Sequence, residues 1–564
     1  MNEKKKAEAE PAFLVGGWSV LPDRNLIRQA GATVHLEPRV MDLLVYLAER
    51  PDEVLSTEQI INDVWPHAYV TDGALLTALS ALRKALGDDP KRSTYIETIP
   101  KRGYRLIAAS SASTSVLAVL PIRNATGDPG QSFLADGLTN GLIDALGTIP
   151  ALRVISRSSA MSVGHAKLRV HDVATRLGAR LVLTGSIAKD RRRGLVVEVE
   201  LTDVKRNARI LNETYKRPES EWVELQQDII HDVGSIMEDR LRSAPDPKRN
   251  RAHPDAVIEY LRGRYHFYRL SPDHFSKALA HFERAIDIDP RYAQPHVGIA
   301  DVWGGFAYWG ARRASEVRDH VLMHVRKAIE IDADNSEALA IRASVEMYFA
   351  HDWAAAETDL RRAVALNANL CHTRLISSIL LGTLKRPKAY DEIEQALRID
   401  PLNPAVLLVR ALIHSGFGEF DAALQDADEL LSIDARHRPG LQLRADLNWL
   451  RGGSDGLRFE CDVWQSDAQV LAALTSHRDA AAALQSAVEV LTARAQGNYV
   501  PPYEVARLLS LGGRIPAAVD CIEEALDDGD FMRVDFLQMS PAFAAVRAHA
   551  HYRGIADRLG LPVR

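Results

Sequence analysis

The stretch that decides the fold runs from Val70 to Leu106 and reads VTDGALLTALSALRKALGDDPKRSTYIETIPKRGYRL. Its first half predicts a helix with one apolar face, because leucines recur there at helical spacing. These leucines are Leu75, Leu79, Leu82 and Leu86. Its second half alternates as a strand and then turns at Gly103, a residue that tolerates the backbone of a tight bend. The stretch therefore predicts a helix followed by a β-hairpin with a basic tip.

The opposite face of this predicted helix is small and polar. It consists of Gly73, Thr77, Ser80 and Lys84, flanked by Ala74 and Ala81. Such a face fits the major groove of duplex DNA, and a basic hairpin can reach the neighbouring phosphates. Seven basic and three acidic residues lie between Arg83 and Arg105, whereas the whole chain has a formal net charge of −6. Affinity for DNA would therefore come from this local patch.

The residues expected to contact double-stranded DNA lie on this helix and on the hairpin. They are Thr71, Gly73, Ala74, Thr77, Ala78, Ser80, Ala81, Arg83, Lys84, Lys101, Arg102 and Tyr104. Two interpretations of Arg83 stay open at this point. Its guanidinium either contacts a phosphate or pairs within the fold with an acid such as Asp88 or Asp89.

This stretch ends a predicted domain over residues 12–108. Short β-like segments come first, a helix follows from about Pro38, and Ser56 with Gln59 forms a capping pattern that opens the next helix. The domain resembles the OmpR/PhoB-type winged helix, and within that type the one-component CadC/ToxR/HilA-like class of bacterial regulators. The motifs that carry the resemblance are Val64-Trp65-Pro66, Val70–Asp72, Leu79–Gly87, Ile96–Thr98 and Gly103–Arg105.

The resemblance implies a transcription regulator that binds promoter DNA as a homo-oligomer, at direct-repeat half-sites roughly one helical turn apart, and that contacts RNA polymerase. No receiver domain precedes the winged helix, so a one-component type is expected. Response regulators of this type often place histidine and arginine where this chain has Ala78, Ser80 and Ala81. The chain is therefore expected to read thymine methyl groups through its alanines and DNA shape through the hairpin.

Residues 115–243 predict an α/β domain, because strand-like runs alternate with helical ones. The segments VLAVLPIRNATGD, FLADGLTNGLIDAL, RVISRSS and LGARLVLTGSI resemble the TolB amino-terminal-like domain, which implies an accessory or oligomerising module. Gly127, Asp128, Asp136 and Ser158 are either turn and cap residues or the lining of an effector pocket. The motifs of P-loop, serine-hydrolase and zinc-protease sites do not occur here, so no catalytic residues and no enzyme activity are expected.

Residues 254–564 predict an all-α solenoid, because a short motif recurs along them. Its acidic or amide marker returns at intervals of 43, 35, 33 and 34 residues. The markers are Asp289, Asp332, Asn367, Asp400 and Asp434. A period near 34 is typical of tetratricopeptide repeats, which this region resembles and which bind protein or peptide partners. The aromatic residues that either line a partner groove or fill space between helices are Trp303, Tyr308, Trp309, Tyr348 and Trp353.

The remaining composition indicates no metal site, no cofactor and no membrane anchor. The three cysteines lie far apart, and no ligand spacing occurs at His274, His281, His351 or His372. The amino-terminal MNEKKKAEAEP has no apolar core, and no apolar run approaches the roughly 18 residues of a membrane helix. A soluble, cytoplasmic protein is expected, nucleoid-associated when bound to DNA.

Two functions remain in view. The first is a sequence-specific transcription regulator whose carboxy-terminal domains sense, oligomerise or bind a partner. The alternative is a protein-interaction scaffold in which the winged helix mainly recruits protein. Salt-sensitive binding to duplex DNA separates the two, because contacts to phosphates release counterions.

Overall fold

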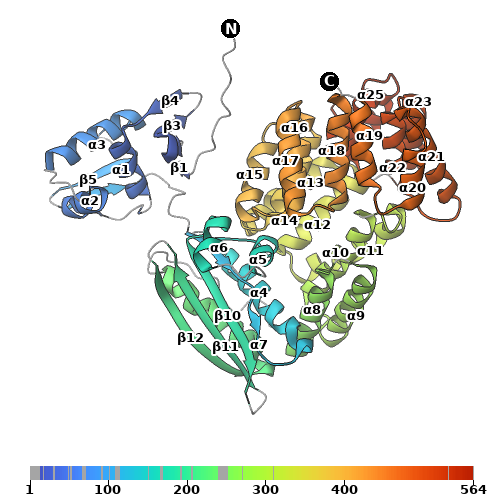
Figure 1. Ribbon diagram of the computed structural model, residues 1–564. Coiled ribbons are helices and arrows are strands. Elements are labelled where there is room, and N and C mark those ends of the chain that lie inside the picture. Colours follow the sequence, from blue (N-terminus) through green and yellow to red (C-terminus); the bar gives the residue numbers. More distant parts are fainter. Residues whose placement is uncertain are drawn as a thin grey trace, which may run out of the picture. The chain divides into compact units, whose positions relative to one another are not determined.

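In a computed structural model the chain forms two compact units, residues 1–115 and residues 116–564, shown in Figure 1. The structure describes residues 13–562 except for short stretches. These are 17, 30–31, 49, 51–53, 66–71, 90–92, 101, 108–114, 150–151, 165–168, 191–193, 205–206, 239–251, 270, 309, 452 and 531–532. Thr71, Lys101 and Trp309 therefore lie outside the described residues, as does the side chain of Tyr308.

The amino-terminal unit combines a four-stranded antiparallel sheet with helices and a terminal hairpin (Figure 1). The strands of the sheet, in spatial order, are β1 (Phe13–Val15), β2 (Trp18–Leu21), β3 (Leu26–Gln29) and β4 (Ala32–His35). The following elements are α1 (Pro38–Ala48), α2 (Thr57–Val64), α3 (Asp72–Leu86), β5 (Ile96–Ile99) and β6 (Gly103–Leu106). This is the predicted winged-helix architecture.

The leucine stripe of α3 lies in the core of this unit, as predicted. Leu75, Leu79, Leu82 and Leu86 are each at most 3% exposed, and they pack with α1 and the hairpin. The predicted capping box of α2 is also present. The Gln59 N–H donates to Ser56 Oγ, and the Ser56 N–H donates to Gln59 Oε1. Local capping and helical periodicity therefore position α2 and α3 directly.

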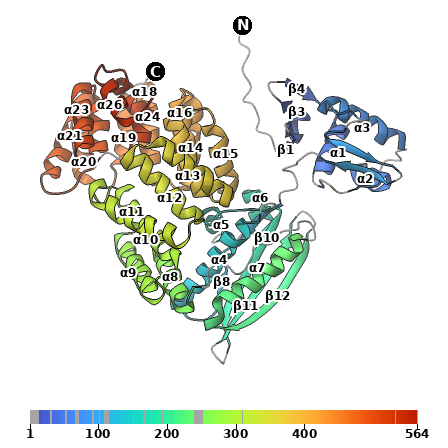
Figure 2. The ribbon, with the colours of Figure 1, turned by 180° about the vertical axis from the view of Figure 1, so that it is seen from behind.

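The second unit begins with the predicted α/β part. Its sheet has the order β12-β11-β10-β7-β9, with β8 beside β10. The strands are β7 (Ser115–Val119), β8 (Arg123–Asn124), β9 (Leu152–Val154), β10 (Leu181–Lys189), β11 (Gly194–Asp203) and β12 (Ala208–Pro218). Helices α4 (Ser132–Gly147) and α7 (Trp222–Glu238) pack on one face, and Figure 2 shows α7 along the sheet. Helices α5 (Arg157–Gly164) and α6 (Val170–Leu177) pack on the other face, over β7.

The rest of the second unit is helical and has the texture of tetratricopeptide repeats (Figure 1). The helices are α8 (Pro254–Phe267), α9 (Pro272–Ile288), α10 (Ala293–Tyr308), α11 (Ala314–Ile331), α12 (Ser336–Val345), α13 (Trp353–Leu366), α14 (Cys371–Thr383), α15 (Ala389–Ile399), α16 (Pro404–Gly416), α17 (Phe420–Ile433), α18 (Arg438–Arg451), α19 (Gly453–Val463), α20 (Ala468–Thr475), α21 (Ala480–Ala495), α22 (Pro502–Leu511), α23 (Ile515–Asp527), α24 (Val534–Met539), α25 (Ala544–Arg547) and α26 (Tyr552–Leu559). The repeated markers of the sequence cap the carboxy-terminal ends of α9, α11, α13, α15 and α17. Each period of the sequence therefore corresponds to one pair of helices.

One of these markers joins the helical part to the α/β part. The carboxylate of Asp400 is 1% exposed and lies at the amino-terminal end of α5. Its Oδ1 accepts from the Ser159 N–H at 3.0 Å, and its Oδ2 accepts from Ser156 Oγ at 2.9 Å. The hydroxyl of Ser158 and the side-chain amide of Asn403 also donate to it. A helix amino terminus stabilises an anion, so Asp400 holds α5 against the repeats.

We expect Asp400→Ala to loosen this junction by about 3 kcal/mol, because several charge-assisted hydrogen bonds are lost together. Hydrogen exchange of the backbone amides in residues 156–164, measured in the full chain, should then accelerate by about two orders of magnitude. Asp434→Ala is the matched control, since Asp434 caps α17 and accepts from the Arg436 N–H within its own turn. Equal acceleration of these amides in both variants would contradict the assigned role of Asp400.

Candidate nucleic-acid interface

The outward face of α3 carries most of the residues that the sequence assigns to DNA contact. Exposed side chains and backbone on this face belong to Gly73, Ala74, Thr77, Ser80, Ala81 and Lys84. Leu76 is also exposed on α3, with 56% of its surface accessible, and it was not among the residues predicted to contact DNA. Its position could have been found, because Leu76 is three residues after Gly73 and four before Ser80, the spacing of one helix face.

The prediction that Ala78 faces DNA is wrong. Ala78 is 7% exposed and packs in the core of the unit. It follows Leu75 by three residues and precedes Leu82 by four, so helical geometry places it within the leucine stripe. An alanine is small enough to fit between these leucines.

The two interpretations of Arg83 are decided in favour of pairing within the fold. Its side chain is 13% exposed, and its guanidinium donates to the Ile96 carbonyl oxygen and to Thr98 Oγ1, both at 2.9 Å. Its Nε lies 3.9 Å from Asp88 Oδ2. Arg83 thus connects the end of α3 to strand β5, and the predicted phosphate contact by this residue is wrong for this arrangement of the domain.

Asp88 organises the same junction from the other side. Its carboxylate accepts from the N–H groups of Thr94, Tyr95 and Ile96 at 2.7 to 3.1 Å. Burial by itself would raise the pKa of this carboxyl, but the hydrogen bonds from these three backbone groups hold it below the usual value. The start of the hairpin is therefore fixed to the end of α3 by one ionised side chain.

Gly103 fixes the other end of the hairpin. Its φ is +137°, and a Cβ at this position would overlap the carbonyl oxygen of Leu55. The adjacent Tyr104 exchanges two backbone hydrogen bonds of 2.9 Å with Leu55, and its half-buried ring packs against the core. Tyr104 is thus a structural residue first. Arg102 is exposed at the turn, where its own N–H donates to the Ile99 carbonyl oxygen.

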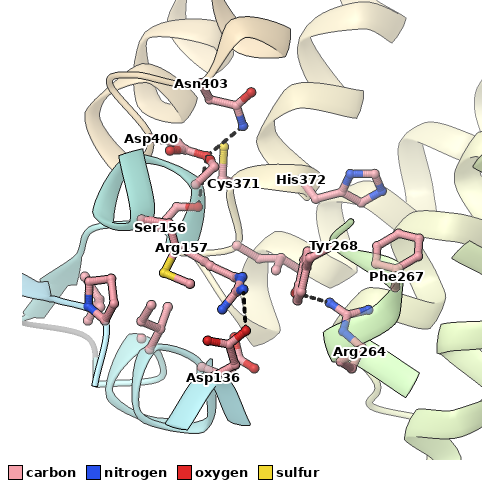
Figure 3. A pocket seen from close by; sticks show the side chains of 18 of the residues that line it. Asp136, Ser156, Arg157, Arg264, Phe267, Tyr268, Cys371, His372, Asp400 and Asn403 are labelled. Atoms are coloured by element: carbon pink, nitrogen blue, oxygen red, sulfur yellow. Dashed lines mark hydrogen bonds and ion pairs between the residues drawn. The ribbon is translucent and has the colours of Figure 1, made fainter. Parts of the chain in front are cut away.

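The second unit contains a cavity of about 1110 Å³, lined by the α/β part and by the repeats (Figure 3). Of the four residues weighed for an effector pocket, Asp136 and Ser158 line it. Gly127 and Asp128 instead form a turn, in which Gly127 has a φ of +80° and Asp128 caps the Gly130 N–H. The turn-and-cap interpretation is therefore correct for that pair.

Charged and aromatic side chains meet in this cavity (Figure 3). Arg157 lies 3.5 Å from Asp136, and its guanidinium carbon is 4.2 Å from the centre of the Tyr268 ring. Arg264 pairs with Asp301 at 2.9 Å and donates to the Tyr268 hydroxyl. Both arginines are thus engaged with neighbours in the cavity wall.

The pKa values of two further carboxylates in the cavity wall are raised. Burial and the nearby charge of Glu337 raise the pKa of Asp144 to about 7, and burial also raises the pKa of Glu337. Asp144 comes from α4 and Glu337 from the first turn of α12, so the two elements bring like charges together. Asp144 lines the cavity, so its carboxylate lies deep within the surrounding protein and is still accessible to a ligand in the cavity.

The other candidates of the helical part are built into its packing. Trp303 stacks on His320 at 4.1 Å between ring centres, and Trp353 donates from Nε1 to the Leu559 carbonyl oxygen. Tyr348 packs against the main core of the repeats. His274 and His281 contact His266 and Glu259 respectively, His372 lines the cavity, and His351 ends a helix with a φ of 54°. Among the described residues, no group of three or more metal-binding side chains comes together.

No helix in the described part of the chain combines the length and the apolar character that crossing a membrane requires.

Residues 31–106 match the family described as "Transcriptional regulatory protein, C terminal". The transcriptional activator CadC of Escherichia coli K12 is 43% identical over 99 residues, which are 17% of this chain and 19% of CadC. The transcriptional regulator HilA of Salmonella typhimurium LT2 is 23% identical over 431 residues, or 74% of this chain and 76% of HilA. The solved DNA-binding domain of E. coli CadC is 41% identical, covers 18% of this chain and 97% of that structure, and has a TM-score of 0.17.

These matches confirm the predicted resemblance to OmpR/PhoB-type regulators, and they support a DNA-binding transcriptional regulator. The chain spans about one fifth of the length of CadC and about three quarters of the length of HilA. CadC is a transcriptional activator and HilA a transcriptional regulator.

We expect Asp88→Asn to destabilise the isolated residues 1–115 by about 2 kcal/mol, because the neutral amide accepts more weakly from the three backbone N–H groups. Since the pKa of Asp88 is lowered on folding, its contribution is fully present above its ordinary value of 3.8 and is lost as the pH falls through the lower, folded value. Urea unfolding between about pH 3 and about pH 7 measures both effects. Glu37→Gln, at an exposed position, is the control, and a wild-type pH profile retained by Asp88→Asn would exclude this role.

Proposed function

We propose that the chain is a one-component regulator that binds promoter DNA sequence-specifically, because residues 31–106 match a transcriptional-regulatory domain family. The exposed face of α3 enters the major groove, and the β5–β6 hairpin contacts the backbone beside it. The observation that carries this proposal is the position of Lys84 and Arg102. Both are exposed cations, one on the last turn of α3 and one at the hairpin turn, whereas Arg83 is engaged inside the domain.

The proposed DNA-contacting set changes accordingly. It comprises Gly73, Ala74, Leu76, Thr77, Ser80, Ala81, Lys84 and Arg102, with Thr71 and Lys101 retained from the sequence. One short helix face and one hairpin turn offer few contacts per protomer, which favours binding as a homo-oligomer to repeated half-sites. A contact with RNA polymerase and a protein partner on the repeats belong to the same proposal, with action in the cytoplasm, where promoter DNA lies. No catalysis is part of it.

Selection of random duplex DNA by the full chain tests this proposal, followed by titrations of the selected site over a range of salt. Lys84→Ala/Arg102→Ala should weaken binding about 100-fold, because two charge-assisted contacts are removed at about 1.5 kcal/mol each. The slope of log K against log salt should fall by about 1.8, since two fewer counterions are released. The double variant Lys216→Ala/Lys277→Ala, at exposed positions of the other unit, should bind like the wild type.

Selection of no motif by the full chain, together with unchanged salt dependence in the Lys84/Arg102 variant, would reject sequence-specific regulation. The scaffold alternative would then explain the winged helix better, because recruitment of protein through this surface needs no phosphate contact.

A specific observation favours a second role, that of an effector site in the cavity of residues 116–564. Asp144, Asp301 and Glu337 surround Arg264, whose guanidinium is already paired with Asp301. Burial raises the pKa of Asp144 and of Glu337, and a neighbouring carboxylate raises each further, so an additional cation beside them would stabilise their charged forms. A ligand carrying an amine or guanidinium group would supply the missing charge, and the ring of Tyr268 offers a surface for a cation.

We expect spermidine to raise the unfolding temperature of the full chain by about 2 to 4 °C at saturating concentration, because it binds the folded state alone. The effect should weaken below about pH 7, where Asp144 becomes protonated and loses its charge. Differential scanning fluorimetry of the wild type and of Asp144→Asn/Glu337→Gln measures this. Glutarate, an anion, is the ligand control, and an equal shift by spermidine in the variant would place its binding elsewhere.

A further inference from the structure

Leu76 is an apolar side chain in an otherwise small and polar surface. It is 56% exposed on α3, between the outward face and the buried stripe, whereas the four leucines of the stripe are at most 3% exposed. Its neighbours on the helix surface are Gly73, which has no side chain, and Thr77 and Ser80, whose side chains are short. Leu76 is therefore the most protruding apolar group on this face, and it has no place in the core.

The neighbours of Leu76 offer few hydrogen bonds to a DNA base. Thr77 donates its hydroxyl to the Gly73 carbonyl oxygen at 2.9 Å, so its donor hydrogen is used within the helix. Arg83 donates to Ile96 and Thr98 within the domain. Among the described side chains from Gly73 to Lys84, the hydroxyl of Ser80 and the ammonium of Lys84 are the polar groups left facing outward. A serine hydroxyl makes no bidentate contact with guanine, and Lys84, which can donate to guanine, lies in the last turn of α3, away from Leu76.

The feature of the major groove that an apolar side chain reads is the C5-methyl group of thymine. We propose that Leu76 is a specificity-determining residue that packs on a thymine methyl in each half-site. The small groups at Gly73, Thr77 and Ser80 let the backbone of α3 approach the base edges closely, so that a leucine reaches the floor of the groove. This inference rests on the proposed function, because it assumes that α3 enters the groove.

The assignment replaces the expectation that alanines alone read thymine. Ala78 is buried, and Ala74 and Ala81 are exposed but extend only one carbon from the backbone. A leucine buries more apolar surface against a methyl group than an alanine does, and its contribution to discrimination is correspondingly larger. Lys84 lies eight residues further along α3, about 12 Å away, where it is positioned for the backbone rather than for the same base.

Removal of single methyl groups from DNA tests this directly. The full chain first selects its motif from random duplex DNA, and each thymine of that motif is then replaced by uracil, which pairs identically but lacks the methyl. For the wild type we expect one thymine per half-site whose replacement weakens binding about fourfold, the factor that corresponds to burial of one methyl at about 0.8 kcal/mol. In Leu76→Ala the same replacement should have no effect, so that the double-mutant cycle shows coupling.

Two controls accompany the cycle. Leu450→Ala removes an equally exposed leucine, 49% exposed, from the other unit, and should leave every uracil effect unchanged. Leu76→Met keeps a long apolar side chain and should retain part of the coupling. Since Leu76 contributes little to the core, Leu76→Ala should melt like the wild type.

The outcomes separate this inference from the function on which it rests. A selected motif whose uracil effects are the same in the wild type and in Leu76→Ala overturns the inference and leaves DNA-binding regulation standing. A motif without any thymine whose methyl contributes to binding also overturns it. If the full chain selects no motif, the proposed function fails, and the inference fails with it.

Discussion

A buried carboxylate that gathers backbone N–H groups is the constraint on which the DNA-binding unit depends. Asp88 stands just after α3 and accepts from three consecutive residues at the start of the hairpin. Arg83, in the last turn of α3, donates to the carbonyl oxygen of Ile96 and to the hydroxyl of Thr98. The helix that would enter the groove and the hairpin that would flank it are thereby one rigid object, whose two contact surfaces keep a fixed spacing.

In the second unit, too, a carboxylate that accepts several hydrogen bonds joins two parts of the structure. Asp400 is a repeat marker like Asp332 and Asp434, and in each repeat that position ends a helix. At Asp400 the side chain accepts from Asn403 nearby and also from the hydroxyl and amide groups at the start of α5. Asn369 makes a comparable contact one repeat earlier, donating to the carbonyl oxygens of Gly147 and Leu152. The turns of a solenoid thus serve as its attachment points to the α/β part, and the cavity lies beside this junction.

Periodicity and local capping predicted much of this fold. The leucine stripe of α3, the capping box at Ser56 and the spacing of the repeat markers each depend on residues close in sequence, and each is present as predicted. The two errors have different origins. The burial of Ala78 follows from its spacing to Leu75 and Leu82, which the sequence already contains. Whether Arg83 faces solvent depends instead on where the distant residues Ile96 and Thr98 lie. The cavity was beyond prediction for the same reason, since Asp144 of α4 and Glu337 of α12 are far apart in sequence and line the same cavity.

The conformation of Gly103 bears on how this surface can change over evolutionary time. Its left-handed backbone and the closeness of Leu55 leave no room for any side chain, so the hairpin turn has one permitted residue at this position. The neighbouring Arg102 has no such restriction, because it is exposed. The residue at position 102 can therefore change in charge and size during evolution, while the conformation of the turn is kept. Under the proposed function, the strength of the contact with the DNA backbone can thus change through single codon changes while the fold is kept.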